Sequence, residues 1–390
     1  MVSIKIQINN EILQWAREDV GLSIEEASAQ SGFSVEELEL WEKGTDQPRL
    51  TQIRELGKLY NRALAFFLLP DPPERKEIPK ELRTLSSAVG VEFSYEAHLA
   101  FSHANDVREI AKSLAEDIGY KQPKQYEIVP TPGNAEALGE EYRKKTGLTF
   151  EIQKRWVDPY DAIRWLRFKI ENLGILVAQY SFPTNEALGF CLIDDTPVIL
   201  VNTKDEFIHR RIFTLIHELA HVLLGVNGIY FGIDEDQLPR GHRKIEQFCN
   251  RFAGAFLVPR ADLLDHFLVR EVKKPIAWTE ETLGLLSRHF KASRESILRR
   301  LMTFGLATPE FYDKKRKDWE DYFKNRPKRT GGRSDPPKDC IRDNGPTMVA
   351  LVLENFAQGN IRVQDVSEYL KIKSKHLPKL DAYLERAREA

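Results

Sequence analysis

One stretch near the middle of the chain constrains the fold most strongly. Residues 212–216 and 222–224 are almost entirely apolar, and neither Gly nor Pro interrupts the run between them. Such a run predicts a largely buried helix. His217, Glu218 and His221 lie inside it. Residues four apart share one helix face, so the two imidazoles point the same way with the carboxylate beside them. Two imidazoles at this spacing can bind one Zn²⁺, and the adjacent carboxylate can accept a proton from water.

A catalytic zinc site needs a third protein ligand and one open position. A Gly and a His three and six residues after His221 would complete one known pattern, but Leu224 and Asn227 stand there. The next predicted helix spans residues 245–259 and has a wide apolar face bordered by Glu246 and Asn250. A carboxylate beside so apolar a face needs a cation, which predicts Glu246 as the third ligand. Asn250, one turn later, could orient a ligand imidazole. The alternative is that Glu246 is a solvated residue on a helix flank.

A longer pattern surrounds these two helices. Its residues are Ile199 to Asn202, Phe213-Thr214, His217-Glu218-Leu219-Ala220-His221, Glu246, Cys249-Asn250, Phe252-Ala253 and Leu257 to Pro259. From Val198 to Pro259 the chain resembles the ImmA/IrrE family of zinc metallopeptidases. The resemblance implies that His217, His221 and Glu246 bind zinc and that Glu218 is the general base. It also implies a gluzincin-like core, with a twisted sheet over two metal-bearing helices. Cys249 and Val258 differ from the residues common in the family and are interpreted as packing changes.

The first 70 residues have a different character. Residues 9–70 read as four or five short amphipathic helices, with a capping box from Ser23 to Glu26 and Ser34 as a further N-cap. This pattern resembles the Cro/repressor-type (XRE) helix-turn-helix. The segment from Leu22 to Tyr60, however, contains eight acidic and four basic residues, so its local net charge is −4. Repulsion from phosphates opposes DNA binding, so a protein-docking module is favoured over a DNA reader.

The remaining patterns divide the chain into five parts and predict an α+β protein. Its zincin (gluzincin-like) metallopeptidase core carries an N-terminal all-α helix-turn-helix domain and a C-terminal helical segment. The predicted parts are a helix-turn-helix domain (1–70), a Pro-rich linker (71–90), a zinc metallopeptidase domain (91–310), a basic linker (311–338) and a C-terminal helical domain (339–390). Predicted strands near 174–178, 189–193 and 197–201 precede the metal helix. The strand around Gly189 is the candidate edge for an extended peptide substrate; the alternative is an ordinary covered edge.

The segment from Gly225 to Arg243 contains four Gly and one Pro, so it is predicted to be a loop close to the metal site. Tyr230 and His242 within it are candidates to stabilise the oxyanion of a tetrahedral intermediate. The alternative for both is an ordinary surface position. The basic clusters at 314–317 and 326–329 favour a solvated linker over a nucleic-acid contact.

Net charge, apolar segments and Cys spacing indicate which partners and which cellular compartment the chain suits. A net charge of −2 shows no excess that would point to nucleic acid or acidic lipid. No signal peptide or membrane-length apolar segment is recognised, and three widely spaced Cys predict no disulfide framework. These features predict a cytoplasmic protein without a membrane partner.

Together the patterns predict a zinc-dependent endopeptidase, with Mn²⁺ or Fe²⁺ as possible alternatives at the same ligands. The resemblance implies one specific protein substrate, a Cro-like transcriptional repressor whose cleavage relieves repression. The alternative function is a DNA-binding transcriptional regulator or antitoxin with a dormant or sensory peptidase domain.

Overall fold

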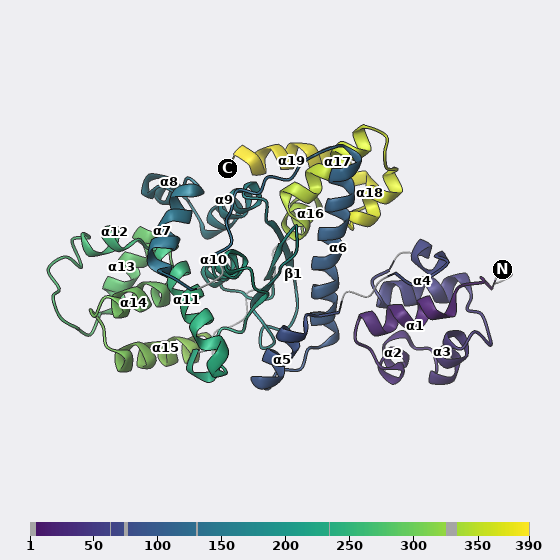
Figure 1. The fold of residues 1–390 in the computed structure, drawn as a ribbon, viewed down its shortest axis with the longest axis horizontal. Coiled ribbons are helices and arrows are strands. Elements are labelled where there is room, and N and C mark those ends of the chain that lie inside the picture. Colours follow the sequence, from purple (N-terminus) through teal and green to yellow (C-terminus); the bar gives the residue numbers. More distant parts are fainter. Residues whose placement is uncertain are drawn as a thin grey trace.

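The computed structural model describes residues 5–62, 64–73, 77–129, 132–233, 235–324 and 334–389. It is mostly helical and contains one four-stranded sheet (Figure 1). The mixed α+β class predicted from the sequence is therefore confirmed, while the relation to zincins stays a prediction. No helix among the described residues is long and apolar enough to cross a lipid bilayer.

The sheet separates two packed layers. Its strands are β1 (Leu176–Tyr180), β2 (Gly189–Leu192), β3 (Val198–Asn202) and β4 (Gly228–Tyr230), in the order β1-β3-β2-β4. β1 is parallel to β3, and β2 is antiparallel to both neighbours. Successive side chains alternate between faces, so Val177 and Ile199 join one core while Ala178 and Leu200 join the other.

The first face of the sheet is covered by the helices that carry the candidate metal ligands. They are α7 (Ala135–Lys145), α8 (Phe150–Arg155), α9 (Pro159–Asn172), α10 (Ile208–Leu224), α11 (Arg240–Leu257), α12 (Arg260–Leu264), α13 (Glu280–Phe290), α14 (Arg294–Thr303) and α15 (Pro309–Lys324), with the 3₁₀ turn η2 (Glu235–Gln237) between β4 and α11. Helix α10 ends at Gly225, whose φ of 67° lies in the left-handed region that favours glycine.

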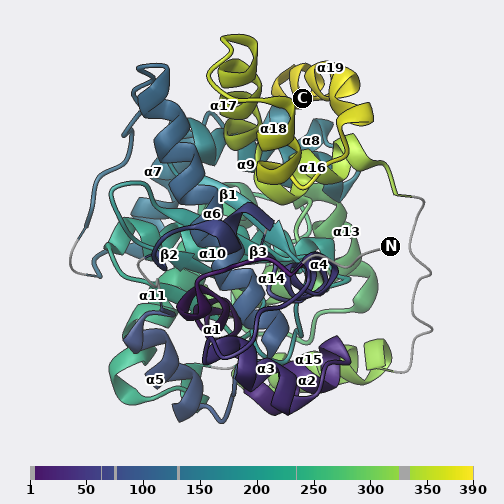
Figure 2. The ribbon, with the colours of Figure 1, turned by 90° about the vertical axis from the view of Figure 1, so that its right-hand side faces the viewer.

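The second face is covered by a long helix and by the C-terminal part of the chain. The elements are α5 (Lys80–Ala88), α6 (Tyr95–Asp117), α16 (Pro336–Asn344), α17 (Pro346–Ala357), α18 (Val363–Tyr369), η3 (Ser374–His376) and α19 (Leu377–Glu389). Figures 1 and 2 both show α16–α19 gathered at one end of α6. Side chains from the sheet, α6 and α16–α19 share one hydrophobic core. The segment predicted as a C-terminal helical domain is thus helical, but it packs as part of the same layer.

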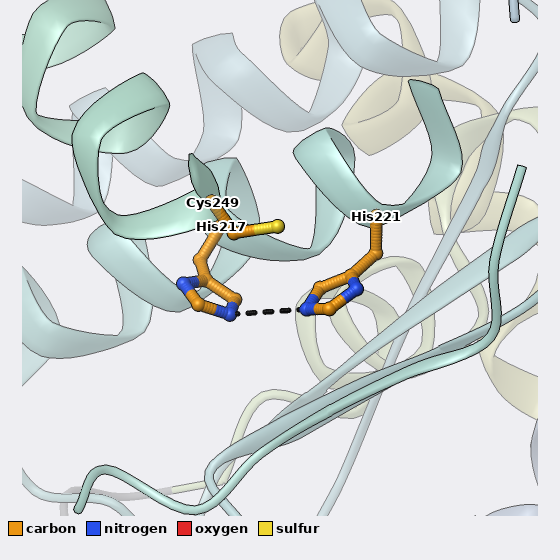
Figure 3. A group of neighbouring side chains, drawn as sticks. All are labelled: His217, His221 and Cys249. Carbon is orange, nitrogen blue, oxygen red and sulfur yellow. Dashed lines mark hydrogen bonds between the residues drawn. The ribbon is translucent and has the colours of Figure 1, made fainter. Parts of the chain in front are cut away.

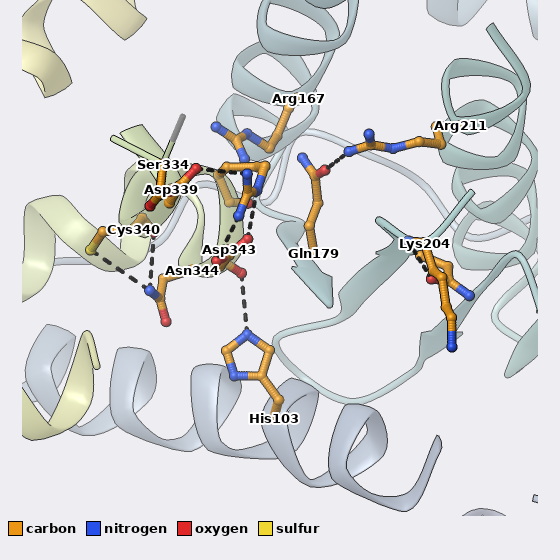
Figure 4. Close-up of polar contacts among 12 residues, drawn as sticks. His103, Arg167, Gln179, Lys204, Arg211, Ser334, Asp339, Cys340, Asp343 and Asn344 are labelled. Atoms are coloured by element: carbon orange, nitrogen blue, oxygen red, sulfur yellow. Dashed lines mark hydrogen bonds and ion pairs between the residues drawn. The ribbon is translucent and has the colours of Figure 1, made fainter. Parts of the chain in front are cut away.

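Polar contacts also join the C-terminal helices to α6 and to α9 (Figure 4). Arg167 of α9 donates to the carbonyl oxygen of Arg342 at 2.7 Å, and His103 of α6 contacts the carbonyl oxygen of Asp343 at 3.2 Å. The backbone N–H of Thr347 donates to the buried Glu171 carboxylate at 2.7 Å. Burial raises the pKa of Glu171 to about 7.

The N-terminal helices form a third, smaller core. They are α1 (Asn10–Asp19), α2 (Ile24–Ser31), α3 (Val35–Glu42), α4 (Leu50–Leu59) and η1 (Leu64–Leu68). The predicted capping box of Ser23 and Glu26 is present, and Ser34 caps α3. These helices lie against α6, on the opposite side of the sheet from α10 and α11 (Figure 1). Arg62 binds Asp19 of α1 and Asp106 of α6 at 2.7 and 3.2 Å. Their assignment as a helix-turn-helix domain stays a prediction.

Two predicted linkers contain regular structure. Within 71–90, residues 80–88 form α5 because Leu82 and Leu85 are buried against the second core. Within 311–338, residues up to 324 belong to α15. Tyr312 is buried there, and Lys315 forms an ion pair with Glu280 at 2.8 Å, so one side of this helix is packed while Lys314 and Lys317 stay exposed. The remaining basic cluster at 326–329 lies outside the described residues.

The strand predicted as a candidate substrate-binding edge is not an edge of the sheet. β2, which contains Gly189, pairs with β3 on one side and with β4 on the other, so it is an interior strand. The prediction that the strand around Gly189 is an exposed edge is therefore wrong. The reason is β4, a three-residue strand inside the segment that was predicted to be loop.

Candidate metal centre

Helix α10 holds its polar triad at the centre of the protein. All residues from 211 to 224 are buried, because the sheet covers one side of the helix while α9 and α11 pack against the others. His217, Glu218 and His221 have at most 2% of their surface exposed. The Nε2 atoms of the two histidines are 3.3 Å apart. The predicted arrangement of the two imidazoles on one helix face is thus present in the structure.

Glu246 of α11 faces both imidazoles. Its Oε2 atom lies 3.1 Å from Nε2 of His217, and its Oε1 atom lies 3.1 Å from Nε2 of His221. Burial alone would raise the pKa of Glu246, but His221 and His217 lower it, so the carboxylate is ionised. Burial alone would lower the pKa of His221, and the neighbouring Cys249 and Glu246 raise it well above its usual value. An anionic carboxylate between two ring nitrogens is an arrangement that suits a cation.

These residues fit a zinc ion. Donor atoms around a tetrahedral zinc at 2.0–2.1 Å are about 3.3 Å from one another. The separations of 3.1–3.3 Å among the two Nε2 atoms and the Glu246 oxygens match that value. Zinc accepts both imidazole nitrogen and carboxylate oxygen. His217, His221 and Glu246 could therefore hold one ion with a position left for water.

Glu218 points toward the same region, and the buried Cys191 thiol lies beside its carboxylate. Both of its carboxylate oxygens are buried without a hydrogen-bond partner among the described residues. Burial raises the pKa of Glu218. A buried carboxylate without a partner is costly, which suggests that a polar group or ion completes its surroundings. Gly228 of β4 makes this close packing possible, because a Cβ atom there would lie 2.4 Å from His221 and 2.8 Å from a Glu218 oxygen.

Asn250 orients one of the imidazoles. Its Oδ1 atom lies 3.1 Å from Nδ1 of His217, so Nδ1–H donates to the amide oxygen and leaves the Nε2 lone pair directed at the site. The Nδ2 group of Asn250 donates to Glu235 at 2.5 Å, and Arg299 donates to the same Glu235 oxygen at 2.9 Å. Arg299 in turn donates to the phenolic oxygen of Tyr312 at 3.1 and 2.8 Å. A continuous chain of polar contacts thus runs from His217 to α15.

The two candidates for oxyanion stabilisation differ in position. Tyr230 of β4 packs on His217, with ring centroids 4.2 Å apart. Burial raises the pKa of its phenol, which therefore keeps its proton as a potential donor. His242 lies half-buried in the first turn of α11, and no hydrogen bond or ring contact joins its side chain to the candidate ligands in the described part of the chain. Of the two, the structure brings only Tyr230 to the site.

Sequence reasoning missed three residues here. Cys249 was interpreted as a packing residue, yet its sulfur and a nitrogen of each imidazole lie within 4.8 Å of one another (Figure 3). Its spacing three residues after Glu246, on the same helix face, was a usable signal. Glu235 lies in η2 and Arg299 in α14, and no local sequence pattern marks either residue as part of the site.

One comparison with known proteins yielded a match. The family model described as the IrrE N-terminal-like domain, of the Peptidase_M78 family, matches residues 170–302. These residues run from the end of α9, through the sheet, α10 and α11, into α14. No curated protein and no solved structure matched the chain. The match indicates a metallopeptidase-type function for the part of the chain that contains His217, His221 and Glu246.

Proposed function

We propose that the chain is a zinc-dependent endopeptidase whose metal ligands are His217, His221 and Glu246. The observation that carries the proposal is the convergence of two Nε2 atoms and one carboxylate at 3.1–3.3 Å inside a buried site. The family match over residues 170–302 supports the same reaction class. Mn²⁺ and Fe²⁺ are alternative occupants, because imidazole and carboxylate also suit these ions.

Each neighbouring residue has a defined task in amide hydrolysis. A zinc ion at this site supplies a Lewis acid that lowers the pKa of water and polarises the scissile carbonyl. Glu218 accepts the proton of the attacking water at its carboxylate and returns it to the leaving amide nitrogen. The Tyr230 phenol donates a hydrogen bond to the carbonyl oxygen as negative charge develops on it. Asn250 keeps the His217 ring in one tautomer and one orientation.

We further propose that the substrate is a Cro-like transcriptional repressor and that its cleavage relieves repression in the cytoplasm. The N-terminal helices support this part, because a helix-turn-helix-like module can pair with a similar fold in its substrate. Their acidic α3, with Glu36, Glu37 and Glu39, disfavours DNA as the partner. Contacts remote from the reacting bond orient a substrate and raise kcat/KM.

The test is cleavage of purified Cro-like repressors from the same genome by the zinc-loaded full chain, followed by mass spectrometry of the products. We expect one internal cut in one repressor, and no cut with the Glu218→Gln variant. Absence of cleavage in every repressor would contradict the proposed substrate class. Equal cleavage by the wild type and by Glu218→Gln would contradict the proposed mechanism.

A further inference from the structure

Cys249 has a position that the proposed three-ligand site does not explain. Its thiol is completely buried and forms no disulfide. On α11 it lies three residues after Glu246 and directly before Asn250, two residues that both contact the imidazoles of α10. Figure 3 shows the sulfur and the two imidazole rings turned toward one common space. Cys249 therefore faces the candidate metal site from the same helix as the carboxylate ligand.

The distances fit a sulfur donor. Sulfur binds zinc at about 2.3 Å and imidazole nitrogen at about 2.0–2.1 Å, so in a tetrahedral site the two donors are about 3.6 Å apart. The sulfur and a nitrogen from each histidine already lie within 4.8 Å of one another. The carboxylate of Glu218 gives an independent sign of an occupant, since it is fully buried and has no hydrogen-bond partner among the described residues.

We propose that Cys249 is a fourth metal donor, which converts the site between a closed and an open coordination. The inference rests on the proposed zinc site. With His217, His221, Glu246 and Cys249 bound, zinc has four protein ligands, the closed shell typical of structural sites. When the sulfur leaves, three ligands remain and water can occupy the fourth position, as hydrolysis requires. The chain would thus hold its metal tightly in a resting form that does not hydrolyse peptides.

The exchange balances without any oxidant or reductant. On closing, the Cys249 S–H bond breaks, a zinc–sulfur bond forms and the proton passes to solvent as water leaves the metal. On opening, water replaces the thiolate, which takes up a proton again. Thiolates are stronger zinc donors than water, so the closed form is favoured until a substrate or another ligand competes for the position.

Cobalt substitution tests this proposal directly on the full chain. A thiolate bound to Co²⁺ produces a sulfur-to-metal charge-transfer band in the near ultraviolet, whereas nitrogen and oxygen ligands do not. We expect this band in the Co²⁺-loaded wild type and its loss in Cys249→Ala. Cys340→Ala, which removes a buried thiol far from the site, and Cys191→Ala should both keep the band. Circular dichroism of each variant checks that it is folded.

Zinc affinity provides a second readout. Outer contacts to metal ligands are worth about 10- to 100-fold in affinity, so loss of a direct donor should weaken zinc binding by at least about tenfold. We expect Cys249→Ala to show this loss and Cys340→Ala to bind zinc as tightly as the wild type. If Co²⁺ binds without a sulfur band, or if Cys249→Ala keeps the band, the fourth-donor proposal is overturned and the proposed function stands. If neither Co²⁺ nor Zn²⁺ binds the wild type, both fail.

Discussion

The α10–α11 pair and the N-terminal helices both bury charged side chains between helices, but they treat them differently. In the N-terminal core, Arg17 of α1 binds both carboxylate oxygens of Glu42 at 2.8 Å and also donates to the carbonyl oxygen of Leu22. In the α10–α11 pair, neither carboxylate oxygen of Glu218 has a hydrogen-bond partner among the described residues, and two imidazoles and Glu246 converge on one point. Buried charge that is satisfied internally supports a fold, whereas buried charge that converges without full satisfaction marks a binding site.

The largest expected effect comes from removing the unsatisfied charge. Glu218→Gln keeps the shape and the hydrogen-bonding capacity of the side chain but cannot accept a proton from water. General-base catalysis contributes about 10²- to 10⁴-fold, so we expect a loss of that size in kcat with metal content unchanged. Repressor cleavage and elemental analysis of the same samples measure both quantities. A variant that lost its metal together with its activity would assign Glu218 to metal binding instead.

The buried ion pair of Arg17 and Glu42 should contribute to stability and have no effect on the metal site. Arg17→Ala leaves Glu42 buried without its cation, which costs about 3 kcal/mol in comparable buried pairs. We expect a destabilised N-terminal core and an unchanged zinc content. Lys43→Ala is the matched control, because Lys43 pairs with Glu39 at an exposed position of the same helices. Equal denaturant midpoints for the two variants would show that the buried pair does not stabilise this core.

Loss of the polar contacts that link His217 to Asn250 and Glu235 should have an effect of intermediate size on zinc affinity. Asn250→Ala and Glu235→Gln disturb the orientation of a ligand without removing a donor atom. We expect zinc affinity to fall by about 10- to 100-fold in each, with the larger loss in Asn250→Ala. Asp236→Asn is the control, since Asp236 adjoins Glu235 but is exposed. A competition titration with a chelator measures the zinc affinities. Unchanged affinities in both variants would show that Asn250 and Glu235 do not support the metal ligands.

The smallest expected effect concerns DNA. Each phosphate that a protein neutralises contributes about 0.9 to the log–log slope of affinity against salt. The charge of −4 between Leu22 and Tyr60 makes such a slope hard to produce. We therefore expect negligible binding of the full chain to a duplex from the upstream region of its own gene at physiological salt. Sub-micromolar, sequence-selective binding in an anisotropy titration would favour the alternative of a transcriptional regulator with a dormant peptidase domain.

Local patterns in the sequence predicted well the two helices that carry the candidate metal ligands. The apolar run around His217 predicted α10, and the apolar face beside Glu246 and Asn250 predicted α11, although that helix begins five residues earlier than expected. The spacing of these residues within single helices made their faces predictable. The four positions named for the metal and its general base all lie together in the structure.

Tertiary placement explains what the sequence could not reveal. β4 has only three residues, Gly228 to Tyr230, and it becomes a strand because β2 pairs with it. Glu235 and Arg299 meet across a gap of 64 residues. Helices α16–α19 join the sheet layer through a core whose members come from distant parts of the chain. These contacts join residues far apart in the chain, so no periodic pattern in the local sequence predicts them.

The claim that His217, His221 and Glu246 hold one catalytic metal ion is tested by the metal stoichiometry of the full chain. Elemental analysis of the purified protein after zinc loading should give about one zinc per chain in the wild type, since the three donors form a single site. Glu246→Ala should retain little zinc after dialysis, while Glu281→Ala, which changes an exposed glutamate on α13, should bind as the wild type does. Equal zinc occupancy in the wild type and in Glu246→Ala would contradict the claim.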